Sequence, residues 1–333
     1  MPRSRGIAYL VASVVLVAVA GSGLGSEEAR PPGKLPRIEQ GELIGVYPGK
    51  YTYVERGPLP ALPASVMVYQ VQPRQSKKAL LSQLVRALRI EMTPGIEAQL
   101  SHIARLPKSW LPEEEPLSPT IGEWDVTIYP GGHFSAGNQR LAARMDKGNL
   151  PAPSEDDARK AADAFLARIE HLLPYPVRFT GVHPAYRESR GSVDWKVLSL
   201  GVSYRAEIDG IEVGHRVSFV VGPEAEVVSL SSTLRRVVPY RRFPILSPKE
   251  AFEKVRAGEG LITDGPSWNA TAYLDTVKLV YWQGNLAQDF PYLMPFYLLK
   301  GEAVAEGKKT VRWAAELEAI RPEWLEDKDP ERP

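Results

Sequence analysis

The sequence has no cysteine and almost no excess of charge, and each absence removes a class of function. Without cysteine among its 333 residues the chain has no thiol nucleophile, no disulfide and no thiolate metal site. Its 41 lysines and arginines are balanced by 40 acidic residues, so no overall field directs it to a polyanion. We therefore expect no nucleic-acid partner and no chemistry that requires a thiol.

Histidine is also scarce, and its spacing matches no metal or catalytic motif. No two of the five histidines stand four residues apart or form a His-x-His pair. The chain has neither a Gly-x-Ser-x-Gly elbow nor a Gly-Lys-Ser/Thr phosphate loop. The acidic run 113–115 lies beside prolines, which favours a solvated turn. We expect no cofactor, no metal and no catalytic residue, and hence a protein that is not an enzyme.

What the sequence does contain begins with an export signal. Arg3 and Arg5 form a basic start, and Gly6–Ala20 is apolar. Ala18-Val19-Ala20 has the small-x-small form that signal peptidase cleaves, which places the cut between Ala20 and Gly21. The alternative is an uncleaved membrane tether through residues 6–26, roughly the ~20 residues that a membrane span needs. Both interpretations place the body of the protein outside the cytoplasm.

Prolines stiffen the segment that follows. The chain has 30 prolines, about twice the ~5% average, and many lie in residues 26–65. Proline lacks the amide donor that a central strand requires, so this segment is predicted to be a mostly irregular, semi-rigid tether.

The clearest pattern in the chain is a hairpin. Val202–Ile208 and Ile211–Val221 are rich in strand-forming residues and are separated by Asp209-Gly210, a dipeptide favoured in tight hairpin turns. Residues 226–238 are predicted to form a third strand, and Ser247-Pro-Lys-Glu opens a helix with a capping box.

A similar pattern precedes and follows the hairpin. Ser154 is a helix cap followed by acids, and the residues Ala158, Ala161, Ala162, Phe165, Leu166 and Ile169 form an apolar stripe. Further strands are predicted at 66–72, 177–182, 272–282, 292–300 and 310–320, a further hairpin at 124–136, and helices at 76–91 and 95–106. The pattern indicates an α+β fold in which helices pack on small antiparallel sheets, as repeated helix-plus-hairpin modules.

These motifs support a resemblance. The stretch Ser154-Glu-Asp-Asp-Ala-Arg-Lys-Ala-Ala-Asp-Ala-Phe-Leu, with Tyr204 and the Asp209-Gly210 turn, resembles a PepSY-type module, as does Ser247-Pro-Lys-Glu-Ala-Phe-Glu-Lys-Val. Over roughly Ser154–Ile320 the arrangement is similar to the YycH/YycI class of extracytoplasmic regulatory proteins of Gram-positive bacteria. The resemblance implies a non-catalytic, regulatory or inhibitory role and carries over no functional residue.

The predicted organisation follows from these segments. We expect a signal peptide or anchor at 1–25, a proline-rich tether at 26–65, an N-terminal α+β region at 66–150, PepSY-like modules at 151–245 and 246–322, and a polar tail at 323–333.

Two surface features are candidates for binding. The first is the basic cluster Arg235, Arg236, Tyr240, Arg241 and Arg242, which would suit an acidic partner or an anionic polymer. The competing interpretation is that these arginines only protect a strand edge from pairing. The second is an aromatic set around Trp282, which serves either as core or as a groove for sugar or peptide. Its members are Tyr281, Trp282, Phe290, Tyr292, Phe296, Tyr297 and Trp313.

The sequence thus predicts an exported or membrane-tethered module that binds an unidentified envelope or membrane protein and regulates it. Two alternatives remain open: an inhibitor or chaperone of a secreted peptidase, and a binder of cell wall or carbohydrate.

Overall fold

The computed structural model describes most of the chain after its first segment. The described residues are 33–37, 49–72, 76–106, 115–129, 131–146, 150–190, 194–282 and 290–326, with the backbone alone at 186–190 and 194–196. The predicted export segment, with its cleavage site at Ala20 and Gly21, lies outside them, as do parts of the predicted tether and tail. None of the helices in these ranges is long and apolar enough to cross a membrane.

The described residues form five α-helices and fourteen strands. The helices are α1 (Lys77–Ala87), α2 (Pro94–Arg105), α3 (Gln139–Asp146), α4 (Glu155–Ile169) and α5 (Pro248–Arg256), with short 3-10 turns η2 (Glu170–Leu172), η3 (Pro223–Ala225) and η4 (Pro322–Trp324). The strands are β1 (Tyr51–Glu55), β2 (Ser65–Val71), β3 (Thr120–Ile121), β4 (Trp124–Ile128), β5 (Phe134–Asn138), β6 (Val177–Arg190), β7 (Asp194–Ile208), β8 (Ile211–Val221), β9 (Val227–Ser232), β10 (Val237–Pro244), β11 (Leu261–Asp264), β12 (Ala270–Trp282), β13 (Tyr292–Val304) and β14 (Val311–Glu318).

Local signals in the sequence are confirmed at the helix starts. The Ser154 hydroxyl accepts a hydrogen bond from the Asp157 amide, 3.1 Å away, at the start of α4. At α5 the Ser247 amide donates to Glu250 Oε2 at 2.6 Å, and the Glu250 amide donates back to Ser247 Oγ at 3.2 Å. This reciprocal pair is the predicted capping box.

The predicted central hairpin is also confirmed. Asp209 and Gly210 both have positive φ, 52° and 75°, which is the backbone of a type I′ turn. Strand β7 is longer than predicted, because it begins at Asp194 rather than Val202.

The single third strand predicted at 226–238 is wrong. Strands β9 and β10 replace it, and they pair with different partners: β9 with β5 and β8, β10 with β2. The chain leaves one part of the sheet after Ser232 and joins another at Val237. Periodicity alone does not reveal this break, because both pieces have strand-forming residues.

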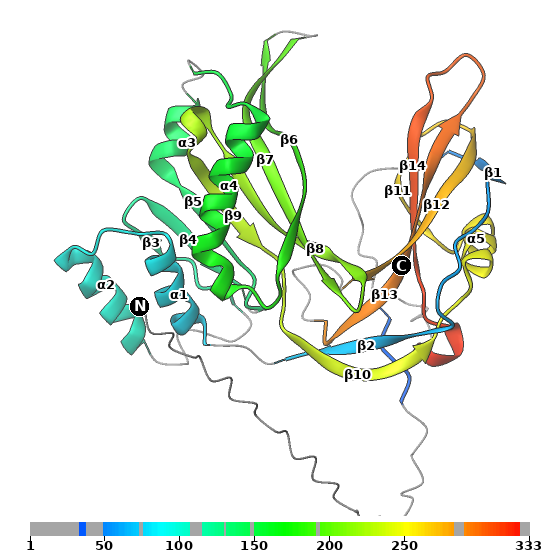
Figure 1. The fold of residues 1–333 in the computed structure, drawn as a ribbon, viewed down its shortest axis with the longest axis horizontal. Coiled ribbons are helices and arrows are strands. Elements are labelled where there is room, and N and C mark those ends of the chain that lie inside the picture. The colour runs from blue at the N-terminus through cyan, green and yellow to red at the C-terminus, as the bar shows by residue number, and fades with distance from the viewer. Residues whose placement is uncertain are drawn as a thin grey trace, which may run out of the picture. The chain divides into compact units, whose positions relative to one another are not determined.

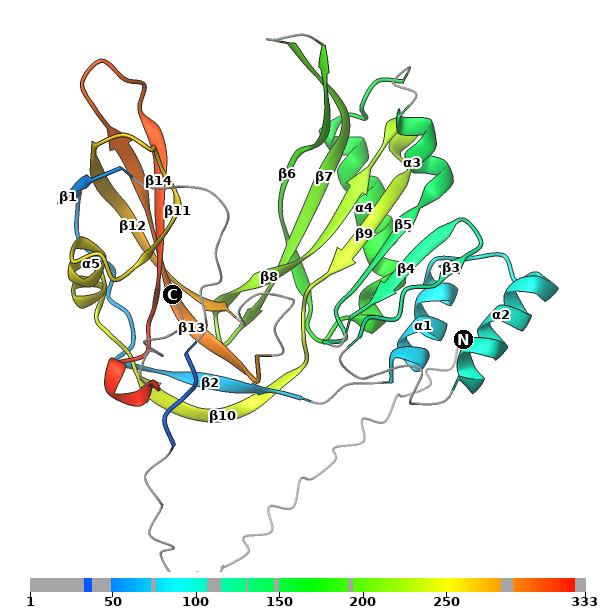
Figure 2. The ribbon, with the colours of Figure 1, turned by 180° about the vertical axis from the view of Figure 1, so that it is seen from behind.

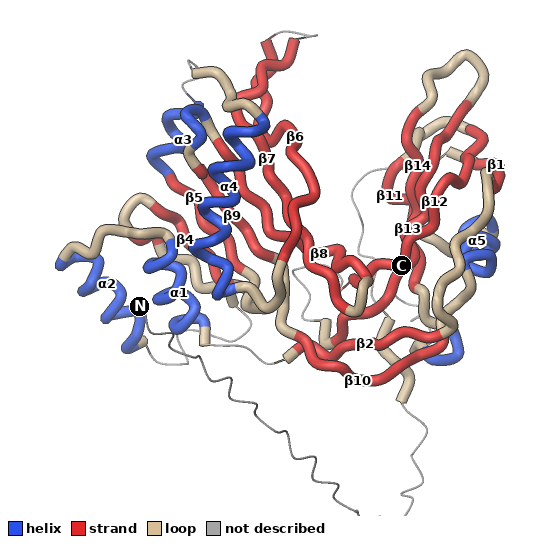
Figure 3. The backbone as a smooth tube through the Cα atoms, viewed as in Figure 1, coloured by secondary structure: helices blue, strands red, loops and turns tan. Residues whose placement is uncertain are grey.

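The predicted architecture of repeated helix-plus-hairpin modules is contradicted. The described strands form one 14-stranded mixed sheet, whose main path is β10-β2-β13-β12-β8-β9-β5-β4-β3 (Figures 1 and 3). Two of its pairings, β1 with β12 and β8 with β12, are parallel. Helices are few beside it. The expectation failed because caps and turns specify neighbouring elements, whereas the pairing of distant strands depends on tertiary packing.

Residues within the proline-rich segment contribute to this sheet. Tyr51–Glu55 forms β1 and pairs in register with the first residues of β12. The Lys50 amide donates to the Asn269 side-chain oxygen at 3.0 Å, beside the start of that pairing.

The continuity of the sheet depends on a short joint between β8 and β12. These strands pair only at Glu212 with Val280 and at Val213 with Tyr281. The turn of the β7–β8 hairpin also contacts β2, because the Tyr69 hydroxyl of β2 donates a hydrogen bond to the Asp209 carboxylate. The rings of Tyr69 and Tyr281 meet edge to face, with centroids 5.3 Å apart. The hairpin tip is therefore fixed by both β2 and β12.

The helices α1, α3 and α4 lie on one face of strands β4, β5, β9, β8 and β7 (Figures 1 and 2). The Tyr204 hydroxyl donates to Asp163 of α4 at 2.6 Å, and the rings of Phe165 and Phe219 lie 5.8 Å apart. Successive side chains of a strand alternate between the two faces of the sheet. Ser203, next to Tyr204, and Ser218, next to Phe219, therefore point to the face opposite α4.

Candidate binding face

The face opposite α4 carries a row of arginines. Arg178 of β6 is the register partner of Arg205 of β7, and Arg205 is the register partner of Arg216 of β8. Neighbouring strands lie about 4.8 Å apart, and like charges directly opposite one another destabilise a sheet. Three arginines side by side therefore need anions close to them. We call these three residues the arginine row.

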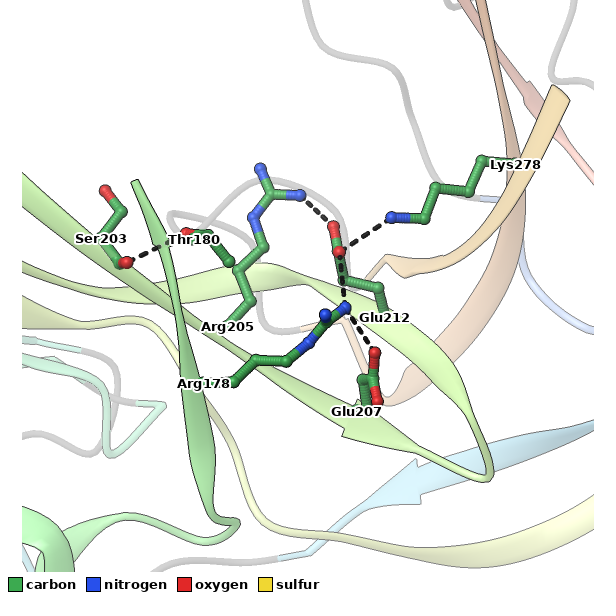
Figure 4. Close-up of polar contacts among 7 residues, drawn as sticks. All are labelled: Arg178, Thr180, Ser203, Arg205, Glu207, Glu212 and Lys278. Carbon is green, nitrogen blue, oxygen red and sulfur yellow. Dashed lines mark hydrogen bonds and ion pairs between the residues drawn. The ribbon is translucent and has the colours of Figure 1, made fainter. Parts of the chain in front are cut away.

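A buried glutamate supplies part of that negative charge (Figure 4). The Glu212 side chain is only 7% exposed and forms an ion pair with Arg205. Its Oε2 also lies 2.8 Å from Lys278 Nζ and 3.4 Å from an Arg178 nitrogen. Arg178 forms a second ion pair with Glu207, which is the register partner of Glu212.

The charges around Glu212 keep it ionised. Burial by itself would raise the pKa of its carboxyl, but hydrogen bonds from Lys278 and Arg205, together with their charges, hold the pKa below its ordinary value. Glu212 is thus a fixed anion that stabilises two members of the arginine row and one lysine of β12.

The third member of the row has no such anion. Arg216 is exposed, and in the described part of the chain its guanidinium has no hydrogen bond or ion pair. Only its backbone is engaged, through the Thr233 hydroxyl at 2.9 Å from the Arg216 amide. The arginine row and Lys278 bring four cations to this part of the sheet against the two carboxylates Glu207 and Glu212.

A row of hydroxyls lies beside the arginine row on the same face of the sheet. It begins at Ser203 and Ser218, which are two residues away from Arg205 on β7 and from Arg216 on β8. Its members are register partners on five adjacent strands, β7, β8, β9, β5 and β4. We call them the hydroxyl row: Ser203, Ser218, Ser231, Ser135 and Thr127.

Two hydroxyls of this row are unsatisfied. The side-chain oxygens of Ser203 and Ser218 are buried, and neither has a hydrogen-bond partner among the described residues. Native proteins leave few buried polar groups unpaired, so these two oxygens call for an explanation.

The next row along the strands is low in side-chain bulk. It contains Gly201, Val220, Ser229 and Gly137, again as register partners. A Cβ at Gly201 would lie 2.5 Å from His183 Nε2, so the imidazole of His183 lies directly on that glycine. The His183 ring therefore covers Gly201, and small residues keep this row low only at Ser229 and Gly137.

The predicted site residues Arg235 and Trp282 meet elsewhere, around His215. The rings of His215 and Trp282 are stacked, with centroids 5.1 Å apart. Arg235 is 6% exposed rather than on the surface. Burial, and to a smaller degree the charge of Arg235, lower the pKa of His215 to about 4. This group is a packed structural cluster next to the β8–β12 joint.

The other predicted arginines lie on or beside an edge strand. β10 ends the path of the sheet and pairs only with β2 among the described strands. Arg241 and Arg242 are exposed and consecutive, so they turn to opposite faces. Tyr240 lies at a register shift next to Pro239, and Arg236 is exposed just before the strand. Together with the burial of Arg235, this placement means that the cluster does not form one basic surface.

Most of the aromatic set predicted near Trp282 belongs to the core. Tyr281, Phe296, Tyr297 and Trp313 are each at most 2% exposed. Trp282 itself is half-buried against His215. The four buried rings therefore serve as core.

Other features of the described residues offer less. No group of three or more His, Asp or Glu in them is placed to hold a metal ion. Two open hollows of about 460 Å³ each lie beside β1 and β12 and beside the start of α5. At the second hollow the charges are already paired, Lys254 with Glu259 and Arg321 with Glu250.

Comparison with known proteins adds no assignment. No protein-family model and no curated protein matches the chain. The chain is similar to an uncharacterized protein from Eubacterium rectale, known from a crystal structure, at 10% identity and a TM-score of 0.38, over 81% of this chain and 88% of that one. A likeness of this degree carries no function.

Sequence reasoning missed this face, although a signal for it was present. Serine or glycine recurs at every second residue in Ser199–Ser203 and in Ser229–Ser231, which marks one face of each strand as small and polar. The alignment of these positions across five strands appears only when the register is known.

Proposed function

We propose that the protein is a non-catalytic module that works outside the cytoplasm and binds a protein of the cell envelope through the face defined by the arginine row and the hydroxyl row. The observation that carries the proposal is this face: it is free of the described helices and polar in register, and its exposed Arg216 has no partner of its own in the described chain. Arginine is enriched at surfaces that bind another protein chain.

The role outside the cytoplasm rests on the sequence. The basic start at Arg3 and Arg5 and the apolar run after it support export. In this proposal the protein acts as a regulator of its partner, like the extracytoplasmic regulatory proteins of the YycH/YycI class that the sequence resembles.

Export is tested on the native protein. N-terminal sequencing should begin near Gly21 or Ser26. A protein that begins at Met1 or Pro2 and resists carbonate extraction would instead be held by an uncleaved anchor. A protein recovered only in the cytoplasm would contradict the proposal.

Binding is tested by site-specific crosslinking in intact cells. A photo-crosslinking amino acid replaces Ser231, in the middle of the hydroxyl row, or Lys160, an exposed residue of α4 on the helix side. We expect one defined protein to be captured from position 231 and not from 160. Capture of a secreted peptidase would select the alternative role of inhibitor or chaperone. Equal capture from both positions would rule out this face.

A further inference from the structure

We infer that the contact between His215 and Trp282 is an acid-sensitive link between β8 and β12, and that protonation of His215 separates these two strands while the cores beside them stay folded. The inference concerns regulation and does not depend on the proposed function. Three observations carry it: the geometry of the stacked rings, the division of the buried side chains into two cores, and the lack of an anion around His215.

The stacked rings lie directly beside the joint of the sheet. Among the described residues β8 and β12 pair at only two positions, and the stack lies at the next residues of each strand. The ring centroids of His215 and Trp282 are 5.1 Å apart, and their planes differ by 15°. A Cβ on Gly214 would lie 2.4 Å from the Trp282 ring, so the indole also covers that glycine. A change at His215 therefore acts on a contact that adjoins both strand pairings.

The strands on either side of the joint belong to different cores. One cluster of buried apolar side chains comes mainly from α1, α4 and strands β4, β5 and β7–β9, and the other mainly from α5 and strands β12–β14. Trp282 packs against the second cluster, whereas Val213 and Val217, the neighbours of His215 on the same face of β8, belong to the first. Strand β2 pairs with both β10 and β13 and keeps the two parts connected. Loss of the stack therefore opens the joint with little exposure of either core.

His215 forms no ion pair with the described residues. It is 6% exposed, and its Nε2 has no hydrogen-bond partner among them. The charge that acts on it is that of Arg235, which is also 6% exposed. The other titratable groups on the adjoining segments are Glu212 and Arg216 of β8, Lys278 and Tyr281 of β12, and Arg236 next to Arg235. The single carboxylate of this set already contacts three cations. An imidazolium here would add a second buried cation and an N–H without an acceptor.

Opening of the joint relieves this cost, so a proton favours the open form. Burial and, to a smaller degree, the charge of Arg235 lower the pKa of His215 to about 4 from an ordinary 6.5. In the open joint the imidazole regains water, and the open form therefore binds the proton first as the pH falls. The ratio of open to closed joint should rise below pH 6.5 by up to ~10-fold per pH unit, until about pH 4. The indole ring attracts an imidazolium, but stacking offers its N–H no acceptor.

The same opening changes the proposed binding face. Lys278 Nζ lies 2.8 Å from Glu212 Oε2 across the joint (Figure 4). When β12 separates from β8, that carboxylate is left with Arg205 and Arg178 alone. The joint thus connects the pH to the charge of the arginine row.

The experiment uses single cysteines in the full-length protein, which has none of its own. Val213→Cys places a thiol in the joint, and the controls Ala206→Cys on β7 and Ala315→Cys on β14 place one in each core. All three positions are at most 3% exposed. The rate of reaction with a disulfide reagent is measured from pH 7 to pH 4.5. Each rate is divided by that of the same variant unfolded in urea at the same pH, so that ionisation of the thiol cancels.

We expect the relative rate at position 213 to rise at least ~10-fold between pH 6.5 and pH 4.5, and the rates at positions 206 and 315 to change less than ~3-fold. Addition of His215→Phe to Val213→Cys should abolish the rise, because phenylalanine keeps a ring against Trp282 but binds no proton. If that double variant does not fold, His215→Gln takes its place, since glutamine does not titrate either.

Three outcomes overturn the inference. A rate at position 213 that does not rise in acid shows that the joint stays closed. Equal rises at all three positions show that acid unfolds the whole protein rather than the joint. A rise that persists without His215 assigns the acid sensitivity to other groups. None of these outcomes affects crosslinking from position 231, which tests the proposed function separately.

Discussion

Lys278 and Glu212 join β12 to β8 through an ion pair in which Lys278 Nζ lies 2.8 Å from Glu212 Oε2. The pair lies beside the only two positions at which the described residues of these strands are paired. The same carboxylate stabilises Arg205 and Arg178 on the binding face. One buried side chain therefore contributes both to the joint of the sheet and to the charge of the proposed site.

Replacement of this glutamate should destabilise the fold. Glu212→Gln leaves Arg178, Arg205 and Lys278 together without their shared anion, and we expect a loss of about 1–3 kcal/mol in the free energy of unfolding. Glu207→Gln is the control, because the Glu207 side chain is 43% exposed and its ion pair among the described residues is with Arg178, which predicts a loss below about 1 kcal/mol. Urea unfolding at pH 7 measures both. Equal losses would show that Glu212 has no special part in the joint.

Acid should lower the free energy of unfolding through protonation of His215. Its pKa is about 4 in the folded chain against an ordinary 6.5, so the unfolded chain binds the proton first as the pH falls. The neutral imidazole therefore contributes stability that is fully present above pH 6.5 and is lost progressively down to about pH 4, by at most about 1.4 kcal/mol per pH unit. Glu212, whose pKa is lowered, loses its contribution only below its ordinary 4.5.

The measurement compares His215→Phe with the unmodified protein. Phenylalanine keeps a ring against Trp282 but does not titrate. Urea midpoints from pH 7 to pH 4.5 should fall more steeply for the unmodified protein than for the variant. Parallel curves would place the acid sensitivity in other groups.

The turn of the central hairpin should tolerate asparagine but not valine. Gly210 has φ of 75°, a conformation that a β-branched residue resists, so Gly210→Val should cost about 1–3 kcal/mol of stability. Gly210→Asn should cost less than about 1 kcal/mol, because asparagine adopts this conformation more readily. Thermal unfolding of both variants is the test, and a similar effect of the two would mean that side-chain size rather than φ decides.

The arginines of β10 should protect an exposed edge. Arg241→Val with Arg242→Val removes two charges from a strand whose outer side is unpaired among the described residues, and we expect aggregation at an unchanged melting temperature. Light scattering follows the aggregation. The control is the double change Arg256→Val and Arg312→Val, which removes the same charge from a helix and an inner strand. A control that aggregates equally would assign the effect to net charge alone.

Several features of the fold were predictable from short stretches of sequence. Ser154, Ser247 and Glu250 specified where two helices begin, since a cap requires only residues three positions apart. Asp209-Gly210 specified a hairpin turn for the same reason. The candidate site was not predictable in this way. Arg235 lies in a basic stretch but is buried, and Arg178, Arg205 and Arg216 are far apart in sequence yet adjacent in the sheet.

The sequence by itself determined the local elements: capped helices, strands with alternating faces, and a type I′ turn. Only the tertiary structure decided that the strands share one sheet, that β8 meets β12 at two positions, and that arginines and hydroxyls from separate strands stand in rows. The physical reason is the range of the interactions. Caps and turns are hydrogen bonds within a few residues, whereas strand register is set by the packing of side chains that meet only when the whole chain has folded.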